Sequence, residues 1–286
     1  MKNGVVSKKP RASLLQSAPD TGVADADHVD AKQAEVGAEV NKAPRPKIPQ
    51  SILWEESLQA VRLSLDCNTK SELTARLREE FSQNSATTRA RNASTVLSRF
   101  FPTRDIDQLP RRVLRLYRDK KLLADVMTVL LPMSEPVIGQ LVADRLFPIE
   151  PGSELPSNFF TSYGQEVYSK NAKDIASRCS GAARVMGWVS RQGAKSYRLY
   201  RPVNQTAALI LIHEIYAPTP RIVELGQILS EPVWKYLGFQ DADQVRAFCR
   251  LMEQKQLIAR YVQVDRLDQI TTRYSVMELM ERKMIL

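Results

Sequence analysis

Apolar residues recur every three or four positions from about residue 51 onward, and this spacing predicts a run of helices. Thr69 and Glu72 form a capping box that opens the second helix, and Pro110 suits the first turn of a later one. Up to residue 150 the segments predicted as helical are 51–66, a helix opened by Thr69, 85–101, a helix from Pro110, 122–131 and 137–147. About six helices in this range predict an all-helical domain.

The pattern changes from helical spacing to alternation between residues 171 and 200. A helical segment over 171–187 has Asn171 as its expected N-cap and is interrupted by Gly181. Gly181 leaves two interpretations open: one bent helix, or two helices about a turn at 179–181 in a helix-turn-helix arrangement. A basic β-hairpin is predicted over 188–200, and a helix followed by such a hairpin is typical of a winged helix. The alternative is an ordinary exposed hairpin.

A similar order of elements is predicted again towards the C-terminus. The remaining predicted elements are helices over 158–168, 206–216, 222–229, 232–237 and 244–256, and strands over 258–264 and 269–275 about a turn at 265–268. Helices followed by a hairpin again indicate a winged helix. The charge of this region is balanced, so we interpret it as a structural or protein-docking copy.

Composition divides the chain into a leader and a folded body. Residues 1–50 contain no aromatic residue, no unbroken apolar stretch typical of a secretory signal, and several closing prolines, so a disordered leader is expected there. Proline and glycine between residues 148 and 156 indicate a domain boundary. We therefore expect a mostly α protein with a helical domain over 51–150 and a winged-helix-type domain over 151–286. The latter divides into winged-helix-like units at 158–202 and 203–286.

The formal net charge of +9 is concentrated in two segments. Residues 89–121, the first basic island, carry ten basic and three acidic residues, and residues 170–201, the second basic island, carry eight and one. A cluster of cations on particular elements is the footprint that binding to phosphate requires. The competing interpretation is that lysine and arginine cover solvated faces.

Arginines in the first basic island form a stripe on one predicted helix. Arg111, Arg115 and Arg118 fall within an arc of about 60° at helical spacing, and the planar guanidinium group suits phosphate oxygens. Most contacts should be to phosphate, and base reading is expected at most from a recognition element, for example through Arg184. The predicted DNA-contact residues are Arg89, Arg91, Arg111, Arg115, Arg118, Lys173, Arg184, Arg191, Lys195 and Arg198.

The chain lacks the motifs that indicate catalysis. It has no GxGxxG, Walker A, GxSxG or HExxH pattern, and its three cysteines are too widely spaced for a metal knuckle. His213 lies in an apolar helix and is interpreted as a core histidine. We expect no enzymatic activity, no cofactor, no metal and no small-molecule substrate. No apolar run is long enough to cross a bilayer, so we expect a cytoplasmic protein without membrane association.

Several short segments together resemble BrxA proteins of bacterial BREX phage-defence systems. The resemblance spans residues 51–276 and rests on diffuse patterns without a catalytic signature. It is carried by Trp54-Glu55-Glu56-Ser57-Leu58, Ser85-Ala86-Thr87-Thr88-Arg89, Asp125-Val126, Asn171-Ala172-Lys173-Asp174-Ile175-Ala176 and Ser230-Glu231-Pro232-Val233-Trp234-Lys235-Tyr236-Leu237-Gly238-Phe239.

The resemblance implies a helical N-terminal domain similar to NusB and a C-terminal part with winged-helix character. It also implies non-enzymatic binding to double-stranded DNA, beside other BREX proteins that methylate host DNA and restrict phage. Members of the family have sometimes been labelled inner-membrane proteins, and the lack of an apolar span in this sequence disagrees with that label.

Three classes of function follow from these observations. The leading hypothesis is a DNA-binding accessory component of a defence system with low sequence specificity. The second is a winged-helix transcription regulator, which would bind one operator far more tightly than bulk DNA. The third is an RNA-binding or scaffold protein, for which exposed aromatics such as Tyr197 and Tyr200 would be needed.

Overall fold

The computed structural model describes residues 50–285 except 169, 193–194, 199–203 and 266, and within 191–198 it describes only the backbone of two strands. The expectation of a mostly α protein is confirmed, since helices make up 62% of the structure. The described residues form 13 α-helices, one short π-helix and six strands. The leader predicted over 1–50 lies almost wholly outside the described residues. The described residues all belong to one compact unit.

The N-terminal half is helical, as the apolar spacing predicts. Thr69 accepts a hydrogen bond from the backbone N–H of Glu72 at 3.1 Å and so begins α2, and Pro110 lies in the first turn of α4. Asp119 begins α5 by accepting from the N–H groups of Lys121 and Leu122. The elements are α1 (Trp54–Ser64), α2 (Lys70–Glu80), α3 (Ala86–Phe100), α4 (Leu109–Tyr117), α5 (Lys120–Ser134), α6 (Pro136–Gln140) and the π-helix η1 (Leu141–Leu146).

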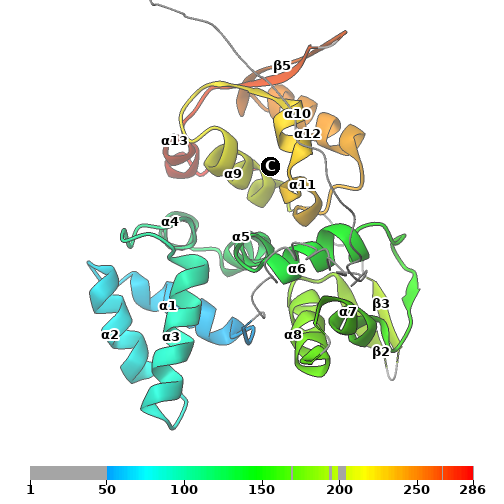
Figure 1. The fold of residues 1–286 in the computed structure, drawn as a ribbon. Coiled ribbons are helices and arrows are strands. Elements are labelled where there is room, and N and C mark those ends of the chain that lie inside the picture. The colour runs from blue at the N-terminus through cyan, green and yellow to red at the C-terminus, as the bar shows by residue number, and fades with distance from the viewer. Residues whose placement is uncertain (1–49, 169, 193–194, 199–203, 266, 286) are drawn as a thin grey trace, which may run out of the picture. The chain divides into compact units, whose positions relative to one another are not determined.

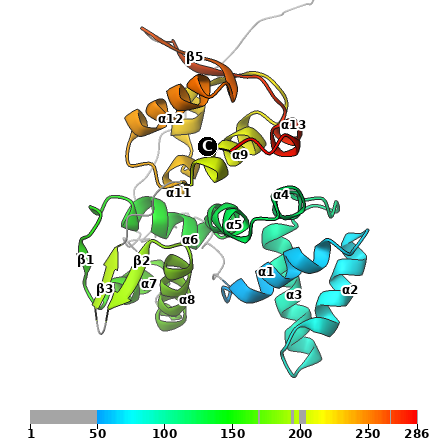
Figure 2. The same ribbon diagram turned by 180° about the vertical axis from the view of Figure 1, so that it is seen from behind.

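Helix α5 is the central element of the described unit (Figures 1 and 2). It contacts α3, α4 and α6 of the N-terminal half and α9 and α11 of the C-terminal half. Its buried residues include Leu123, Met127 and Leu131, which are among the largest fully buried side chains. Because α5 supplies core to both halves, the boundary predicted near residue 150 is crossed by a continuous hydrophobic core.

The segment after residue 150 forms a small sheet with two helices. The elements are β1 (Glu154–Leu155), α7 (Phe159–Val167), α8 (Ala172–Val185), β2 (Val189–Gln192) and β3 (Lys195–Arg198). Helix α8 runs without a break through Gly181, so the single-helix interpretation is correct and the turn at 179–181 is not formed. Cys179, Ala182 and Ala183 are buried on one face of α8, and this tertiary packing stabilises the helical conformation at Gly181 despite the low helix propensity of glycine. Asn171 occupies the N-cap position, but its side chain makes no capping hydrogen bond.

The C-terminal part repeats this order of elements. Residues 222–224 form a strand, which corrects the helix predicted over 222–229, because Val223 pairs with Ile270 across a neighbouring strand. Strand β6 begins two residues earlier than predicted, at Leu267. The elements are α9 (Gln205–Tyr216), β4 (Ile222–Glu224), α10 (Leu225–Ser230), α11 (Val233–Tyr236), α12 (Ala242–Gln254), β5 (Ile258–Val264), β6 (Leu267–Thr272) and α13 (Val276–Glu281).

The two small sheets have the same topology. Their strand orders are β1-β3-β2 and β4-β6-β5, and all pairs are antiparallel. In each, a strand leads into helices, a hairpin follows, and the last strand lies between the other two. We call β1–β3 with α7 and α8 the first unit, and β4–β6 with α10, α11 and α12 the second unit (Figure 1).

Candidate nucleic-acid interface

Helix α8 presents a polar, positively charged face to solvent. Ile175, Cys179 and Ala183 are buried, whereas Lys173 and Arg184 are exposed. Neither cation has an ion-pair partner among the described residues. Helix α8 also contacts α7, α6 and β2, so the first unit holds these two cations on a rigid element. Such a face can bind phosphate oxygens, because its charges are accessible and already positioned.

The hairpin that follows α8 carries three more predicted contact residues. Arg191 pairs in register with Ser196, Gln192 with Lys195, and Val189 with Arg198. The predicted hairpin is therefore confirmed in its backbone. The side chains of Arg191, Lys195 and Arg198 lie outside the described residues.

The predicted arginine stripe on α4 is only partly available to a ligand. Arg111 and Arg115 both lie at Asp107, with shortest N–O distances of 4.0 and 3.0 Å, and Arg111 also donates to the carbonyl of Cys67. Arg118 is exposed at the C-cap of α4 in a left-handed conformation, with φ of 55°. One carboxylate therefore offsets part of the charge of two arginines, and Arg118 is the member of the stripe that is exposed and has no ion-pair partner among the described residues.

Arg89 is a structural residue in this conformation. Its guanidinium group donates to the carbonyls of Arg78 and Gln83 at 2.7 Å and of Asn84 at 3.2 Å, which closes the turn between α2 and α3. Arg91, one half-turn further along α3, is exposed and has no ion-pair partner among the described residues. The two arginines that sequence spacing groups together therefore have different environments.

Two other arginines of the first basic island are internal, which charge counting did not reveal. Arg99 is buried, pairs with Glu135 at 2.7 Å and donates to the carbonyls of Ser51 and Ile52 at 2.8 Å. Burial lowers the pKa of Arg99, and the Glu135 carboxylate opposes that shift. Arg112 pairs with Glu214 at 2.5 Å and joins α4 to α9. The sequence did contain a sign that Arg99 is buried, because two large apolar residues, Phe100 and Phe101, follow it directly and are themselves buried.

The second unit differs from the first in how its cations are used. Arg246 of α12 pairs with Asp243 at 2.8 Å and with Asp268 of β6 at 2.9 Å, and these bonds raise its pKa. Arg250 donates to Gln263 of β5 at 2.8 Å and lies over the ring of Tyr261. The cations of α12 therefore bind the helix to its own hairpin.

Cys179, Cys249 and His213, whose side chains could take part in catalysis, are buried. Burial raises the pKa of the Cys179 and Cys249 thiols to about 12, so both are protonated at neutral pH. His213 is buried, its Nδ1 donates to the carbonyl of Leu209 at 2.9 Å, and burial lowers its pKa. Within the described residues no three His, Cys, Asp or Glu side chains gather as metal ligands.

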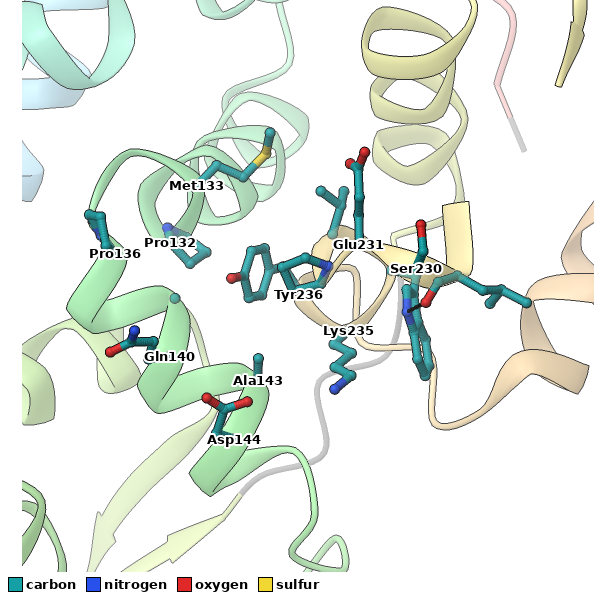
Figure 3. A pocket seen from close by; sticks show the side chains of 15 residues that line it. Pro132, Met133, Pro136, Gln140, Ala143, Asp144, Ser230, Glu231, Lys235 and Tyr236 are labelled. Carbon is teal, nitrogen blue, oxygen red and sulfur yellow. Dashed lines mark hydrogen bonds between the residues drawn. The ribbon is translucent and has the colours of Figure 1, made fainter. Parts of the chain in front are cut away.

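A groove of about 510 Å³ lies between the α5–α6–η1 segment and the chain around α11 (Figure 3). Tyr236 points from α11 toward the wall that contains Pro132. Glu231 accepts from Tyr216 at 3.0 Å, and the Ser230 hydroxyl donates to the carbonyl of Gln227. The Ser230 hydroxyl is therefore bound to the backbone of its own helix, and the Glu231 carboxylate to the Tyr216 hydroxyl.

No single helix among the described residues is long and apolar enough to span a membrane. Helix α5 and the Pro136–Leu146 segment are together long and apolar enough for a membrane span, but the chain bends by 104° between them.

The chain was compared with protein-family models, curated proteins and solved structures, and none matches it.

Proposed function

We propose that this chain is a non-enzymatic, double-stranded-DNA-binding accessory component of a bacterial BREX anti-phage system, acting in the cytoplasm beside other BREX proteins. The first unit and the accessible cations near α4 would contact the phosphate backbone. Such binding has low sequence specificity, because phosphates carry no direct information on base identity.

The proposal interprets the two units as winged helices. A strand, two helices and a hairpin, with the last strand in the middle of the sheet, is the order expected of that fold. On this interpretation α8 and α12 occupy the position of recognition helices, and the hairpins β2–β3 and β5–β6 are the wings. The helices α1–α6 correspond to the NusB-like domain that the sequence resemblance implies.

The observation that carries the proposal is the contrast between α8 and α12. Lys173 and Arg184 of α8 are exposed and have no ion-pair partner among the described residues, whereas Arg246 of α12 is bound by two carboxylates. A recognition helix needs cations without ion-pair partners. A cation that is already paired with a carboxylate of the protein does not neutralise a phosphate, so it releases no counterion from the DNA. We therefore assign DNA contact to the first unit.

Additional contacts are proposed from the first basic island. Arg91, Arg118, Lys120 and Lys121 are exposed and lack an ion-pair partner among the described residues. Arg111 and Arg115 can join them if a phosphate competes with Asp107, and the guanidinium of Arg89 is held by backbone carbonyls. Arg191, Lys195 and Arg198 stay part of the proposed contact set through their place on the β2–β3 hairpin.

Fluorescence anisotropy of a labelled duplex of random sequence measures DNA binding and tests this assignment. The Lys173→Glu/Arg184→Glu variant should bind about tenfold more weakly or worse. The matched control is Lys255→Glu/Arg273→Glu, which makes the same charge change on exposed residues of the second unit and its flank. The control should change affinity by less than about threefold. Equal losses in both variants would show that net charge alone governs binding and would overturn the assignment to α8.

The same assay separates the competing functions. An excess of unlabelled random duplex should displace the labelled DNA from an accessory protein of low specificity, whereas a transcription regulator would retain its operator. Preference for single-stranded or hairpin RNA over duplex DNA would favour the RNA-binding alternative. Neighbouring genes for a DNA methyltransferase and other defence proteins would support the BREX assignment.

A further inference from the structure

The sheet of the second unit has one face against α12 and one face directed away from it. Side chains alternate along a strand, and directly paired residues lie on the same face. Tyr261 pairs with Ile270 and both are buried, and Asp268 reaches Arg246 of α12. The residues between them in sequence therefore form the opposite face, which we call the outer face. It consists of Arg260, Val262 and Val264 on β5, Leu267, Gln269 and Thr271 on β6, and Ile222 and Glu224 on β4.

The outer face is unusually apolar for a solvent-facing sheet. Val264 is 61% exposed, Leu267 is 46% exposed and Ile222 is 56% exposed. Val264 and Leu267 are register partners, so their side chains form one continuous apolar area at the end of the hairpin. Among the described residues, these three are half of the large hydrophobic side chains that are exposed. The Val264–Leu267 area, with Ile222 exposed at the other end of the same face, indicates a surface that binds another protein.

The charges on the outer face are arranged so that the face can bind itself. Arg260 and Glu224 are both exposed, and neither has an ion-pair partner among the described residues. They lie on the two strands that flank β6: Arg260 is level with Thr271 and Ile222, and Glu224 is level with Gln269 and Val262, the next pair on the same face. A surface with a cation on one edge strand, an anion on the other and an apolar area at the end between them can be complementary to its own copy when a twofold rotation brings the two edge strands together.

We propose that the outer face of the second unit binds the same face of a second copy of this chain. A twofold axis parallel to the strands places β6 over the second copy's β6, and β4 over its β5. Leu267 then meets Leu267, Glu224 lies over Val262 of the other copy, and Arg260 of that copy is its diagonal neighbour, one pair further along the strands. Two sheets that pack face to face keep their strands nearly aligned, and this arrangement meets that condition.

Duplex DNA fits this surface poorly. The end of the hairpin carries Asp265 beside Val264 and Leu267, and an exposed carboxylate and apolar side chains gain nothing from phosphate. Arg246 and Arg250 of α12 are bound to residues of the hairpin. The inference therefore does not rest on the proposed DNA binding, and either can fail without the other.

The size of the face predicts a weak dimer. Strands of three, seven and six residues cover an area of at most about 15 by 20 Å, which is small for a protein interface. We therefore expect association with a dissociation constant in the range of about 1–100 μM, not an obligate dimer. Such a dimer forms at high local concentration, for example when several copies occupy one DNA molecule.

Sedimentation velocity of the full chain without DNA, over a range of protein concentrations, tests the proposal. The wild type should shift from monomer to dimer, and Leu267→Lys and Val264→Lys should each weaken dimerisation at least tenfold by placing a charge in the apolar area at the end of the hairpin. Leu65→Lys is the matched control, because Leu65 is 38% exposed on a different element and should leave the dimer unchanged. Thermal unfolding of each variant identifies any that fails to fold.

Charge exchange provides a second test that does not depend on the apolar residues. Arg260→Glu and Glu224→Arg should each weaken the dimer several-fold, and the double variant should restore it, since the two charges meet between copies. A wild type that stays monomeric at about 100 μM would overturn the proposal and assign the face to a different protein. Dimerisation that is unaffected by Leu267→Lys, Val264→Lys and the single charge reversals would also overturn it.

Discussion

The arginines of the first basic island fall into two groups at the scale of single residues. Arg99 and Arg112 form ion pairs with Glu135 and Glu214 and hold parts of the fold together. Arg91 and Arg118 are exposed and lack an ion-pair partner among the described residues. All four carry the same charge in the sequence. The sequence does not distinguish the two groups, because the packing of distant segments decides whether an arginine has a partner.

Replacing Arg99 should destabilise the protein strongly. Arg99→Met removes the cation beside Glu135, leaves that carboxylate with little compensation and releases the carbonyls of Ser51 and Ile52. We expect a loss of about 3 kcal/mol in the free energy of unfolding, measured by urea denaturation.

The double variant Arg99→Met/Glu135→Leu is the control for this prediction. It removes both charges, so it should recover a large part of the loss. If the double variant is less stable than Arg99→Met by a further 2 kcal/mol or so, the cost comes from lost packing and not from the unpaired carboxylate.

His213 should make the protein sensitive to mild acid. Burial holds its pKa below the ordinary value of 6.5, so the unfolded chain binds a proton more readily than the folded one. The stabilisation from neutral His213 is complete above pH 6.5 and is lost as the pH falls through and below that value. The loss is at most about 1.4 kcal/mol for each pH unit.

Unfolding by urea at pH 7.5 and 5.5 measures the effect. The wild type should lose more stability over this interval than His213→Gln, which cannot take up a proton and can still donate to the Leu209 carbonyl. Equal losses would assign the pH dependence to other groups.

At the scale of elements, the close contact between α7 and α8 depends on Gly164. A Cβ atom at this position would lie 2.4 Å from the carbonyl oxygen of Ala172, at the start of α8. Gly164→Ala should therefore push the two helices apart, cost about 2 kcal/mol in stability and weaken DNA binding through α8. Thermal unfolding and duplex anisotropy measure the two effects.

Gly226→Ala is the control for a glycine in a helix. A Cβ atom there meets nothing within 4 Å, so the substitution should leave stability unchanged or raise it by about 0.5 kcal/mol. If Gly164→Ala behaves like Gly226→Ala, the α7–α8 contact is more adaptable than its geometry indicates.

The elements that the sequence predicted well are those with a local cause. Thr69 begins α2 as expected, and Asp241 begins α12 in the same way, because capping hydrogen bonds join residues two or three positions apart. Strand β4 was predicted as helix, since its hydrogen bonds go to β6, about 47 residues later in the chain. A three-residue strand has no periodicity of its own to detect.

At the scale of the whole molecule, DNA binding should depend strongly on salt. Five arginines of the first basic island are held by internal partners, so the second island and the exposed remainder of the first must supply the phosphate contacts. If about six phosphates are neutralised, affinity should fall roughly a thousandfold between 50 and 200 mM salt.

A plot of log affinity against log salt concentration tests this prediction. Replacing Lys173 by Gln should lower the slope by about one, as expected for a cation that contacts one phosphate. Binding that does not respond to salt would contradict an electrostatic interface.

The sequence by itself determined the helical class, the positions of most helices, the two basic islands and the repeated order of helices and hairpin. These features depend on periodicity, capping and composition, which act over a few residues. Only the tertiary structure decided that α8 is one helix, that Arg99 is buried, and that Asp107 offsets Arg111 and Arg115. It also decided that the cations of α12 bind their own hairpin while those of α8 stay exposed. The physical reason is the same in each case: the solvation and pairing of a charge depend on which distant segments the folded chain brings beside it.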